Sequence, residues 1–416
     1  MKQLVTLTVI FTAFALFFSS CEKDGENLDY KEIELSQTQK NMVASGNTFS
    51  FELIRTVHES SDENKNLMIS PLSVHLALAM TANGAKENTL DEMLDVLGFQ
   101  DFDMDEFNAY FKYLMDELTE LDPEVEMEIA NSIWYRNNFD VLSSFLDVNQ
   151  EYYNAEIEAL DFGSPDAVST INNWVADATH QKIDEIIDEI PDEAVMYLIN
   201  AIYFYGTWQY EFDKSQTEDK NFYLADDETV EVPMMQMEAD LKYFSADGTS
   251  IVEIPYGRGN FVMDVILPAQ DQAPENVLST LTAATWSEWT SSLYERPMIL
   301  SMPKFKFEWG KKDLKDVLES LGMHDLFDED AADLSGINEQ MQLYVSKVLH
   351  KTYIDVNEEG TEAAAVTAVE ISNTSAGDDD AQPFYVNVNR PFIFLIRERS
   401  TESILFSGVV NNPLLE

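Results

Sequence analysis

Short, almost entirely apolar segments in the later part of the chain place the strongest limit on its fold. Residues 261–267, 392–397 and 403–410 are too short to cross a membrane and are typical of strands buried on both faces. Further strands are predicted at 126–135, 194–205, 250–255, 298–307, 342–356 and 384–388. We therefore expect large β-sheets with little solvent-facing surface.

The first third of the chain has the pattern of helices. Ser70 is a good N-cap and Pro71 follows it at the first helical position. Residues 103–120 form an amphipathic pattern with an apolar side and an acidic side. Helices first and strands later predict an α+β fold. No linker or repeat divides the chain, so we expect one domain over residues 38–416.

The chain is strongly acidic. It has 25 Lys and Arg against 77 Asp and Glu, which gives a formal net charge of −52. A nucleic-acid binder needs a basic surface, so no nucleic-acid partner is expected. Heparin-like polyanions are disfavoured for the same reason. A well-solvated surface explains the acidity, and adaptation to a saline habitat is a second interpretation, because salt screens repulsion between like charges.

The N-terminus has the pattern of an export signal. Residues 1–20 combine a basic start, an apolar run and two serines directly before Cys21, which is the only cysteine. This resembles the bacterial lipobox, in which the cysteine becomes the lipidated N-terminus. The alternative is an incidental cysteine at a cleavage site. We predict a lipoprotein signal peptide over 1–20 and a polar tether over 21–37. We also predict attachment to a membrane of the cell envelope, and the outer membrane is the one we favour.

Sequence signatures of enzymes are scarce. The five histidines form no H-E-x-x-H motif, and there is no G-x-S-x-G elbow or phosphate-binding loop. The acidic run Asp101 to Asp105 lacks the glycine of a calcium loop. We therefore expect no catalytic residue, no metal and no cofactor. Paired carboxylates for glycoside hydrolysis remain open, since acidic residues are abundant.

Residues 357–382 form an unusual connection between two predicted strands. Thr361, Ala363, Ala365, Thr367, Val369 and Ile371 alternate with residues that could face solvent, and the segment contains no proline. This is the period of a half-buried strand. The segment is either a strand that can insert into a sheet or a flexible surface loop.

At this point the sequence resembles a known family, the serpins. The resemblance runs from about residue 40 to Pro413 and rests on motifs that occur in the family's order. These are residues 66–73 (NLMISPLS), 78–80 (LAM), 83–85 (NGA), 171–175 (INNWV), 200–208 (NAIYFYGTW), 232–235 (VPMM), 321–323 (LGM), 333–337 (DLSGI) and 389–392 (NRPF).

The resemblance implies a serpin fold with three β-sheets, about nine helices and an exposed reactive-centre loop. It also implies a suicide inhibitor of serine endopeptidases. The target protease cleaves the loop and forms an acyl-enzyme, and the cut loop then inserts into the main sheet as a new strand. The protein would act as a monomer that forms a covalent 1:1 complex with the protease.

The resemblance also assigns the loop. The family's hinge is similar to Glu358, Glu359, Gly360, Thr361, Glu362, Ala363, Ala364 and Ala365. About fourteen residues beyond Gly360, the family spacing places the reactive bond between Thr374 and Ser375, with Ile371, Ser372 and Asn373 as alternatives. Small residues there suit elastase-like or subtilisin-like enzymes. Cleavage after Ser372 would place Ile371 where papain-like cysteine proteases favour an apolar residue.

Two further sites follow from the resemblance. Ser70, Ser73, Asn200 and His350 match the shutter, the polar cluster that controls opening of the main sheet. Trp208, Lys304 and Glu358 match the breach, where insertion starts. Tyr205, Gln181 and Val366 depart from the family's common residues. The region that binds heparin in some members lies near 103–120 and is acidic here, so no heparin is expected.

Two alternatives stay open. A non-inhibitory serpin would act as a carrier or chaperone, and its loop would be cleaved without trapping the protease. From a different class, the chain could be a carbohydrate-binding or substrate-binding surface lipoprotein.

Overall fold

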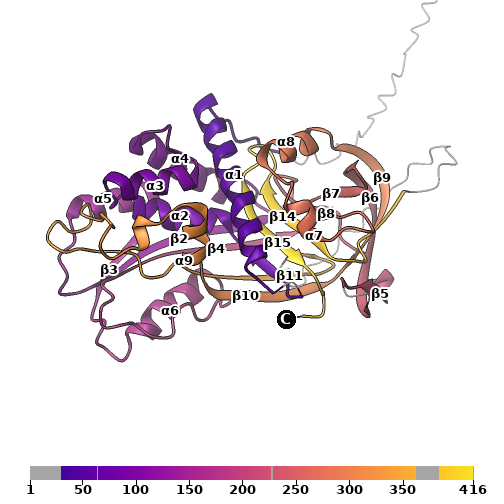
Figure 1. Ribbon diagram of the computed structural model, residues 1–416. Helices are drawn as coiled ribbons and strands as arrows, with labels where there is room; N and C mark the ends of the chain where they lie inside the picture. Colours follow the sequence, from indigo (N-terminus) through magenta and orange to yellow (C-terminus); the bar gives the residue numbers. More distant parts are fainter. Residues whose placement is uncertain (1–29, 63, 226–227, 362–383, 416) are drawn as a thin grey trace, which may run out of the picture.

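The computed structural model describes residues 30–62, 64–225, 228–361 and 384–415 (Figure 1). Within them the α-helices are α1 (Gln37–Glu59), α2 (Pro71–Ala82), α3 (Glu87–Leu97), α4 (Met104–Thr119), α5 (Ser143–Tyr153), α6 (Ala167–Ala178), α7 (Pro274–Leu278), α8 (Ala283–Ser291) and α9 (Lys315–Leu321). Two 3₁₀ turns are η1 (Lys214–Gln216) and η2 (Asp325–Phe327). None of the helices in this part of the chain combines the length and apolar character needed to span a membrane.

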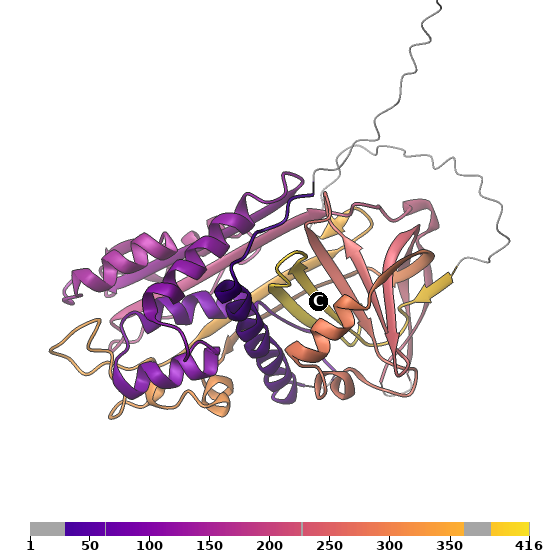
Figure 2. The same ribbon diagram turned by 90° about the horizontal axis from the view of Figure 1, so that it is seen from above.

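The strands are β1 (Leu67–Ile69), β2 (Val125–Arg136), β3 (Glu156–Leu160), β4 (Met196–Thr207), β5 (Glu218–Tyr223), β6 (Thr229–Ala246), β7 (Thr249–Pro255), β8 (Phe261–Leu267), β9 (Tyr294–Pro303), β10 (Phe305–Asp313), β11 (Leu349–Val356), β12 (Gly360–Thr361), β13 (Phe384–Asn387), β14 (Phe392–Glu398) and β15 (Ile404–Val410). Helices α2 to α5 gather at one end of the molecule and strands β6 to β9 at the other (Figures 1 and 2). The mixed α+β fold with nine α-helices in the described residues agrees with the sequence prediction.

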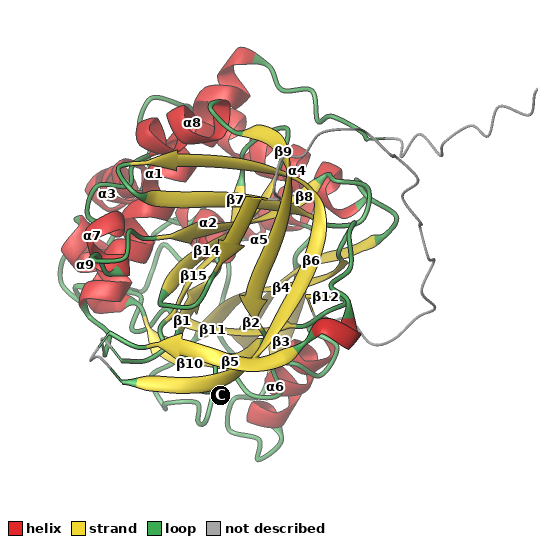
Figure 3. Ribbon diagram, turned by 90° about the vertical axis from the view of Figure 1, so that its right-hand side faces the viewer, coloured by secondary structure: helices red, strands yellow, loops and turns green. Residues whose placement is uncertain are grey.

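The strands form two hydrogen-bonded sheets in the described residues. One has six strands in the order β10-β11-β12-β4-β2-β3. The other has nine, in the order β1-β15-β14-β8-β7-β6-β9-β13, with β5 also paired to β6. The long β6 joins two parts of this sheet, because its first portion pairs with β5 and β9 and its last residues pair with β7 (Figure 3). The three expected sheets are therefore the six-stranded sheet and these two parts.

Local sequence signals explain where the first helices begin. Ser36 caps α1 in a capping box with Gln39, and Ser70 caps α2 by accepting a hydrogen bond from the Ser73 backbone N–H. The predicted N-cap at Ser70 is therefore confirmed. Almost every residue of α2 is buried, because the helix lies between other helices and strands β4 and β15.

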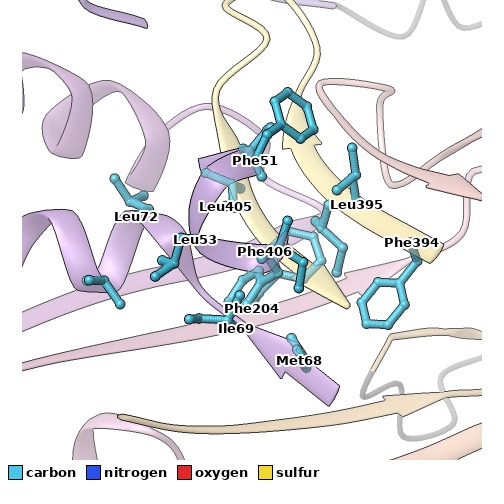
Figure 4. Close-up of a cluster of buried hydrophobic side chains, with 14 of the residues drawn as sticks. Phe51, Leu53, Met68, Ile69, Leu72, Phe204, Phe394, Leu395, Leu405 and Phe406 are labelled. Atoms are coloured by element: carbon cyan, nitrogen blue, oxygen red, sulfur yellow. The ribbon is translucent and has the colours of Figure 1, made fainter. Parts of the chain in front are cut away.

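The core connects both sheets and the helices. Figure 4 shows Phe51 and Leu53 of α1, Leu72 of α2, Phe204 of β4 and Phe406 of β15 in one buried cluster. A second, smaller cluster lies on the other face of the six-stranded sheet, beneath α6. Ile133 belongs to the first cluster and its neighbour Trp134 to the second, as expected for a strand whose two faces are both covered.

Two of the predicted strands differ strongly from the observed ones. Residues 298–307 are not one strand but the end of β9 and the start of β10, which belong to different sheets and meet at Lys304. The strand predicted over 342–356 begins only at Leu349. Within the range 21–37 predicted as the tether, Ile33 is buried and its N–H donates to the Ser400 hydroxyl at 3.0 Å.

Candidate functional site

Strands β4 and β11 of the six-stranded sheet are joined only at one end. There the two residues of β12 pair with both neighbours: Thr361 lies opposite Val356 of β11 and opposite Gly206 of β4. Beyond β12, no strand in the described part of the chain fills the space between β4 and β11. A cavity lies there, lined by residues 200–204 of β4, residues 349–354 of β11 and parts of α6 and the segment after it. Two strand edges that face each other across a gap form a template for an additional strand.

Main-chain hydrogen bonds hold the hinge at the end of this gap. The Trp208 N–H donates to the Glu359 carbonyl at 2.8 Å, and the Phe212 N–H donates to the Glu358 carbonyl at 3.0 Å. The indole N–H of Trp208 donates to the Asn357 carbonyl at 2.9 Å. A side chain at position 360 would overlap the carbonyl oxygen of Gly206, so only glycine permits this close approach.

Thr361 is anchored in the core by an aromatic pair. Its hydroxyl lies 2.6 Å from the Tyr256 hydroxyl, and the Tyr256 ring stacks on Trp208 with centroids 4.3 Å apart. Burial raises the pKa of Tyr256 well above its usual range, so the phenol stays protonated and able to hydrogen-bond with Thr361. Thr361, the first residue after Gly360 of the hinge, therefore already occupies a strand position in the sheet.

Glu358 carries the charged contacts of the hinge. Its Oε2 lies 2.8 Å from Lys304 Nζ, and its Oε1 accepts a hydrogen bond from the Thr217 hydroxyl at 2.8 Å. Burial alone would raise the pKa of Glu358, but the hydrogen bonds from Lys304, the backbone and Thr217 lower it below the usual value. Glu359 makes a separate ion pair with Lys214.

Replacing Lys304 by methionine should destabilise the hinge at neutral pH. Glu358 is nearly buried, so the loss of its cation should lower the free energy of unfolding by about 1–3 kcal/mol. Because the pKa of Glu358 is depressed in the folded state, this difference should shrink as the pH falls through the usual carboxyl range. Urea denaturation at pH 7 and pH 4 measures it. The control is Lys306→Met, which removes an exposed ion pair with Asp355 at 3.6 Å and should change stability little. Equal losses of unfolding free energy in the two variants would contradict the prediction.

The residues predicted as the shutter all line the cavity, but they form two hydrogen-bonded groups. The Ser70 N–H donates to His350 Nε2 at 3.1 Å, and the Ser70 hydroxyl donates to the Leu405 carbonyl at 2.8 Å. Ser73 contributes its N–H to the Ser70 hydroxyl. Asn200 instead donates to Asn131 Oδ1 on β2 at 2.9 Å, and its own Oδ1 is buried and has no hydrogen-bond partner among the described residues.

Lowering the pH should destabilise the protein partly through His350. Burial lowers the pKa of His350 to about 4, so the folded state holds a neutral imidazole that accepts the Ser70 N–H. The unfolded chain binds a proton near pH 6.5, so stability is lost as the pH falls from about 6.5 to 4, by roughly 2 kcal/mol at pH 5. The His350→Gln variant should show a shallower fall in thermal midpoint between pH 7 and pH 5. Parallel curves for the two proteins would contradict this assignment.

Several predicted residues cannot be placed. Glu362, Ala363, Ala364 and Ala365 of the hinge and Cys21 lie outside the described residues, as do Thr374 and Ser375 with the alternatives Ile371, Ser372 and Asn373. Sequence reasoning also missed Thr217, Tyr256 and Asn131, which contact Glu358, Thr361 and Asn200. Asn131 lies opposite Asn200 in the antiparallel pair of β2 and β4, and the two predicted strands do not set that register by themselves.

Comparison with known proteins identifies this architecture. The family model "Serpin (serine protease inhibitor)" matches residues 44–413. The chain belongs to the serpin family. The serpin-family relative Iripin-8 of Ixodes ricinus is 35% identical over 386 residues, which cover 91% of this chain and 95% of Iripin-8.

Two solved serpin structures are similar in fold. The thermophilic serpin tengpin in its native state has a TM-score of 0.81 and 35% identity, over 92% of this chain and 96% of tengpin. Human thyroxine-binding globulin, in complex with thyroxine, has a TM-score of 0.82 and 31% identity, over 90% of this chain and 99% of the globulin. Serpins are generally protease inhibitors rather than enzymes, and the globulin shows that the same fold also binds thyroxine.

Proposed function

We propose that this serpin is an irreversible suicide inhibitor of serine endopeptidases, and that its cleaved loop inserts between β4 and β11. The observation that carries the proposal is the position of β12. Gly360 and Thr361 already pair with both strands at the end of an otherwise unfilled gap. The hinge is therefore the first part of a strand whose remaining place in the sheet is vacant in the described residues.

The register of β12 predicts how the inserted strand would pair. Thr361 lies opposite Gly206, and β12 is antiparallel to β4, so each later residue would pair one position earlier on β4. Residue 371 would then lie opposite Met196, the first residue of β4. Thr361 faces the core, so Ala363, Ala365, Thr367, Val369 and Ile371 would face it as well. These side chains are small or uncharged and can be buried at low cost.

The chemistry of trapping belongs to the protease. Its serine oxygen attacks the carbonyl of the bait residue, the peptide bond breaks, and the C-terminal segment leaves as an amine. An inserted strand of about 14 residues at ~3.4 Å per residue would carry the acyl-linked protease ~48 Å along the sheet. Such a displacement can distort the active site of the protease, where a misplacement of ~1 Å can cost ~100-fold in rate, so deacylation would become slow.

Small residues around Thr374 support elastase-like or subtilisin-like targets, and cleavage after Ser372 would extend the range to papain-like cysteine proteases. The test incubates the protein with proteases of these classes and with a trypsin-like enzyme. We expect a covalent 1:1 complex that survives denaturing electrophoresis. Mass spectrometry should show that the released peptide begins at Ser375 or a nearby residue. Cleavage with release of active protease and no complex would favour a non-inhibitory serpin, the alternative that the thyroxine-binding globulin structure supports.

We also propose that the inhibitor is a lipoprotein of the bacterial cell envelope, tethered through Cys21. The support is the apolar run and the two serines that precede this cysteine. Expression with a Cys21→Ala variant tests it. The wild-type protein should sediment with membranes and carry lipid on its first residue, whereas the variant should not. Recovery of unlipidated wild-type protein would refute the anchor.

A further inference from the structure

Three side chains with metal-binding groups meet on the face of the six-stranded sheet that α6 covers. Glu126 and Glu128 lie two residues apart on β2 and point to the same side, and His180 lies just after α6. His180 Nε2 is 3.2 Å from Glu128 Oε2 and 3.7 Å from Glu126 Oε1. Within the described residues this is the one group of His, Cys, Asp or Glu whose ligand atoms all lie within 4.8 Å of one another.

The imidazole of His180 is held in place by its surroundings. Its ring stacks on Tyr203 of β4 with centroids 4.2 Å apart. His180 and Gln181 both have positive φ angles, 48° and 63°, a conformation that L-residues rarely adopt. The backbone therefore holds an unfavourable conformation here, and this conformation turns the His180 ring toward the two carboxylates.

We propose that Glu126, Glu128 and His180 bind one divalent transition-metal ion of the zinc type. Ligand atoms of a tetrahedral zinc site are separated by about 3.4 Å, given bonds of about 2.1 Å. The distances of 3.2 and 3.7 Å from His180 Nε2 to the two carboxylates lie close to that value. One imidazole with two carboxylates suits zinc and its neighbours in the transition series, whereas magnesium and calcium prefer oxygen ligands alone. Water would complete the coordination, since all three side chains are about half exposed.

The charge around the group favours a cation. A groove next to the site is lined by Glu120, Asp122, Glu124, Glu126 and Glu128. Such a concentration of carboxylates raises the local concentration of cations. The groove by itself does not select a metal; the imidazole supplies the preference for the transition series.

The position of the site connects it to the gap between β4 and β11. Thr179, Lys182 and Ile183, which flank His180 on both sides, line the cavity in that gap. This segment is also held to β11, because Lys182 lies over the Tyr353 ring and Asp184 is 3.6 Å from Lys351 Nζ. A metal ion bound by His180 and the two carboxylates would also attach this segment to β2. The segment would then be held to strands on both sides of the gap. This consequence rests on the proposed inhibitory function: bound metal would slow insertion and shift the protein from trapping the protease toward being cleaved by it.

The first arm of the test titrates the purified, chelator-treated protein with Zn²⁺ by calorimetry, with Mg²⁺ as a comparison. We expect one Zn²⁺ site whose affinity falls at least 30-fold in His180→Asn and in the double variant Glu126→Gln/Glu128→Gln. Asparagine tolerates the positive φ of position 180, and thermal unfolding checks that both variants fold. The control is Glu156→Gln/Glu158→Gln, an exposed carboxylate pair with the same spacing on neighbouring β3, which should bind Zn²⁺ like the wild type. Unchanged affinity in both test variants would overturn the site.

The second arm measures the ratio of cleaved to trapped protein with and without saturating Zn²⁺. We expect the ratio to rise at least 5-fold in the wild type and to stay constant in His180→Asn. A metal that binds but leaves the ratio unchanged would overturn the effect on insertion. Absence of any trapped complex in metal-free protein would instead contradict the inhibitory function, so the two failures are distinguishable.

Discussion

Replacing Thr361 by arginine is expected to abolish the trapped protease complex and to turn the protein into a substrate. Thr361 is only 3% exposed, and its hydroxyl bonds to the buried Tyr256. In the intact variant a guanidinium at this position would move out of the sheet into solvent. Insertion would then have to bury it without supplying an anion, at a cost of several kcal/mol. Each 1.36 kcal/mol added to the barrier slows a step tenfold. Insertion should therefore become at least 100-fold slower and lose the competition with hydrolysis of the acyl-enzyme.

The measurement is the fraction of protein found as covalent complex and as cleaved chain on a denaturing gel. Thr361→Ser, which keeps the hydroxyl, is the matched control and should trap the protease as the wild type does. The rate of the first cleavage should be similar in all three proteins, because the bait bond is far along the chain from position 361. Trapping by the arginine variant at the wild-type ratio would show that the hinge does not enter the sheet at β12.

Cleavage of the loop is expected to raise the thermal stability of the protein strongly. A new strand in the gap would add main-chain hydrogen bonds to both β4 and β11, along about 14 residues. At about 0.5–1.5 kcal/mol net for each bond, the gain is on the order of 10 kcal/mol. For a chain of this size that corresponds to a rise in the unfolding midpoint on the order of 10 °C.

Scanning calorimetry of the intact and the cleaved protein, in the same buffer, measures the rise. The Thr361→Arg variant, cleaved by the same protease, is the control and should show a clearly smaller rise, because burial of the guanidinium offsets several kcal/mol of the gain. If the cleaved wild-type protein unfolded at the temperature of the intact one, the loop would not have joined the sheet, and a carrier function would become the better explanation.

The sequence predicts the elements whose signals are local. Ser70 begins α2, and residues 261–267 form β8 as an apolar strand buried on both faces. Boundaries set by distant partners are harder to predict. The run 298–307 is apolar on both sides of Lys304, and it divides only because β9 pairs with β6 while β10 pairs with β11.

The same distinction applies to the site. Gly360 and the alternating residues after it can be read from the sequence, and the resemblance to serpins places Glu358 and Lys304 together at the breach. The partner of Thr361 is not readable in this way, because Tyr256 lies 105 residues away and nothing in its neighbourhood marks it. The separation of Asn200 from Ser70 and His350 likewise depends on how β2 and β4 pair, which fixes Asn131 as its partner.

Amide hydrogen exchange in β4 and β11, before and after loop cleavage, tests the central claim most directly. In the intact protein the N–H groups that face the gap should exchange quickly, because no strand in the described residues covers them. After cleavage, residues 196–205 and 349–355 should become strongly protected, together with residues of the loop up to about 371. Unchanged exchange in both strands after complete cleavage would contradict insertion between them.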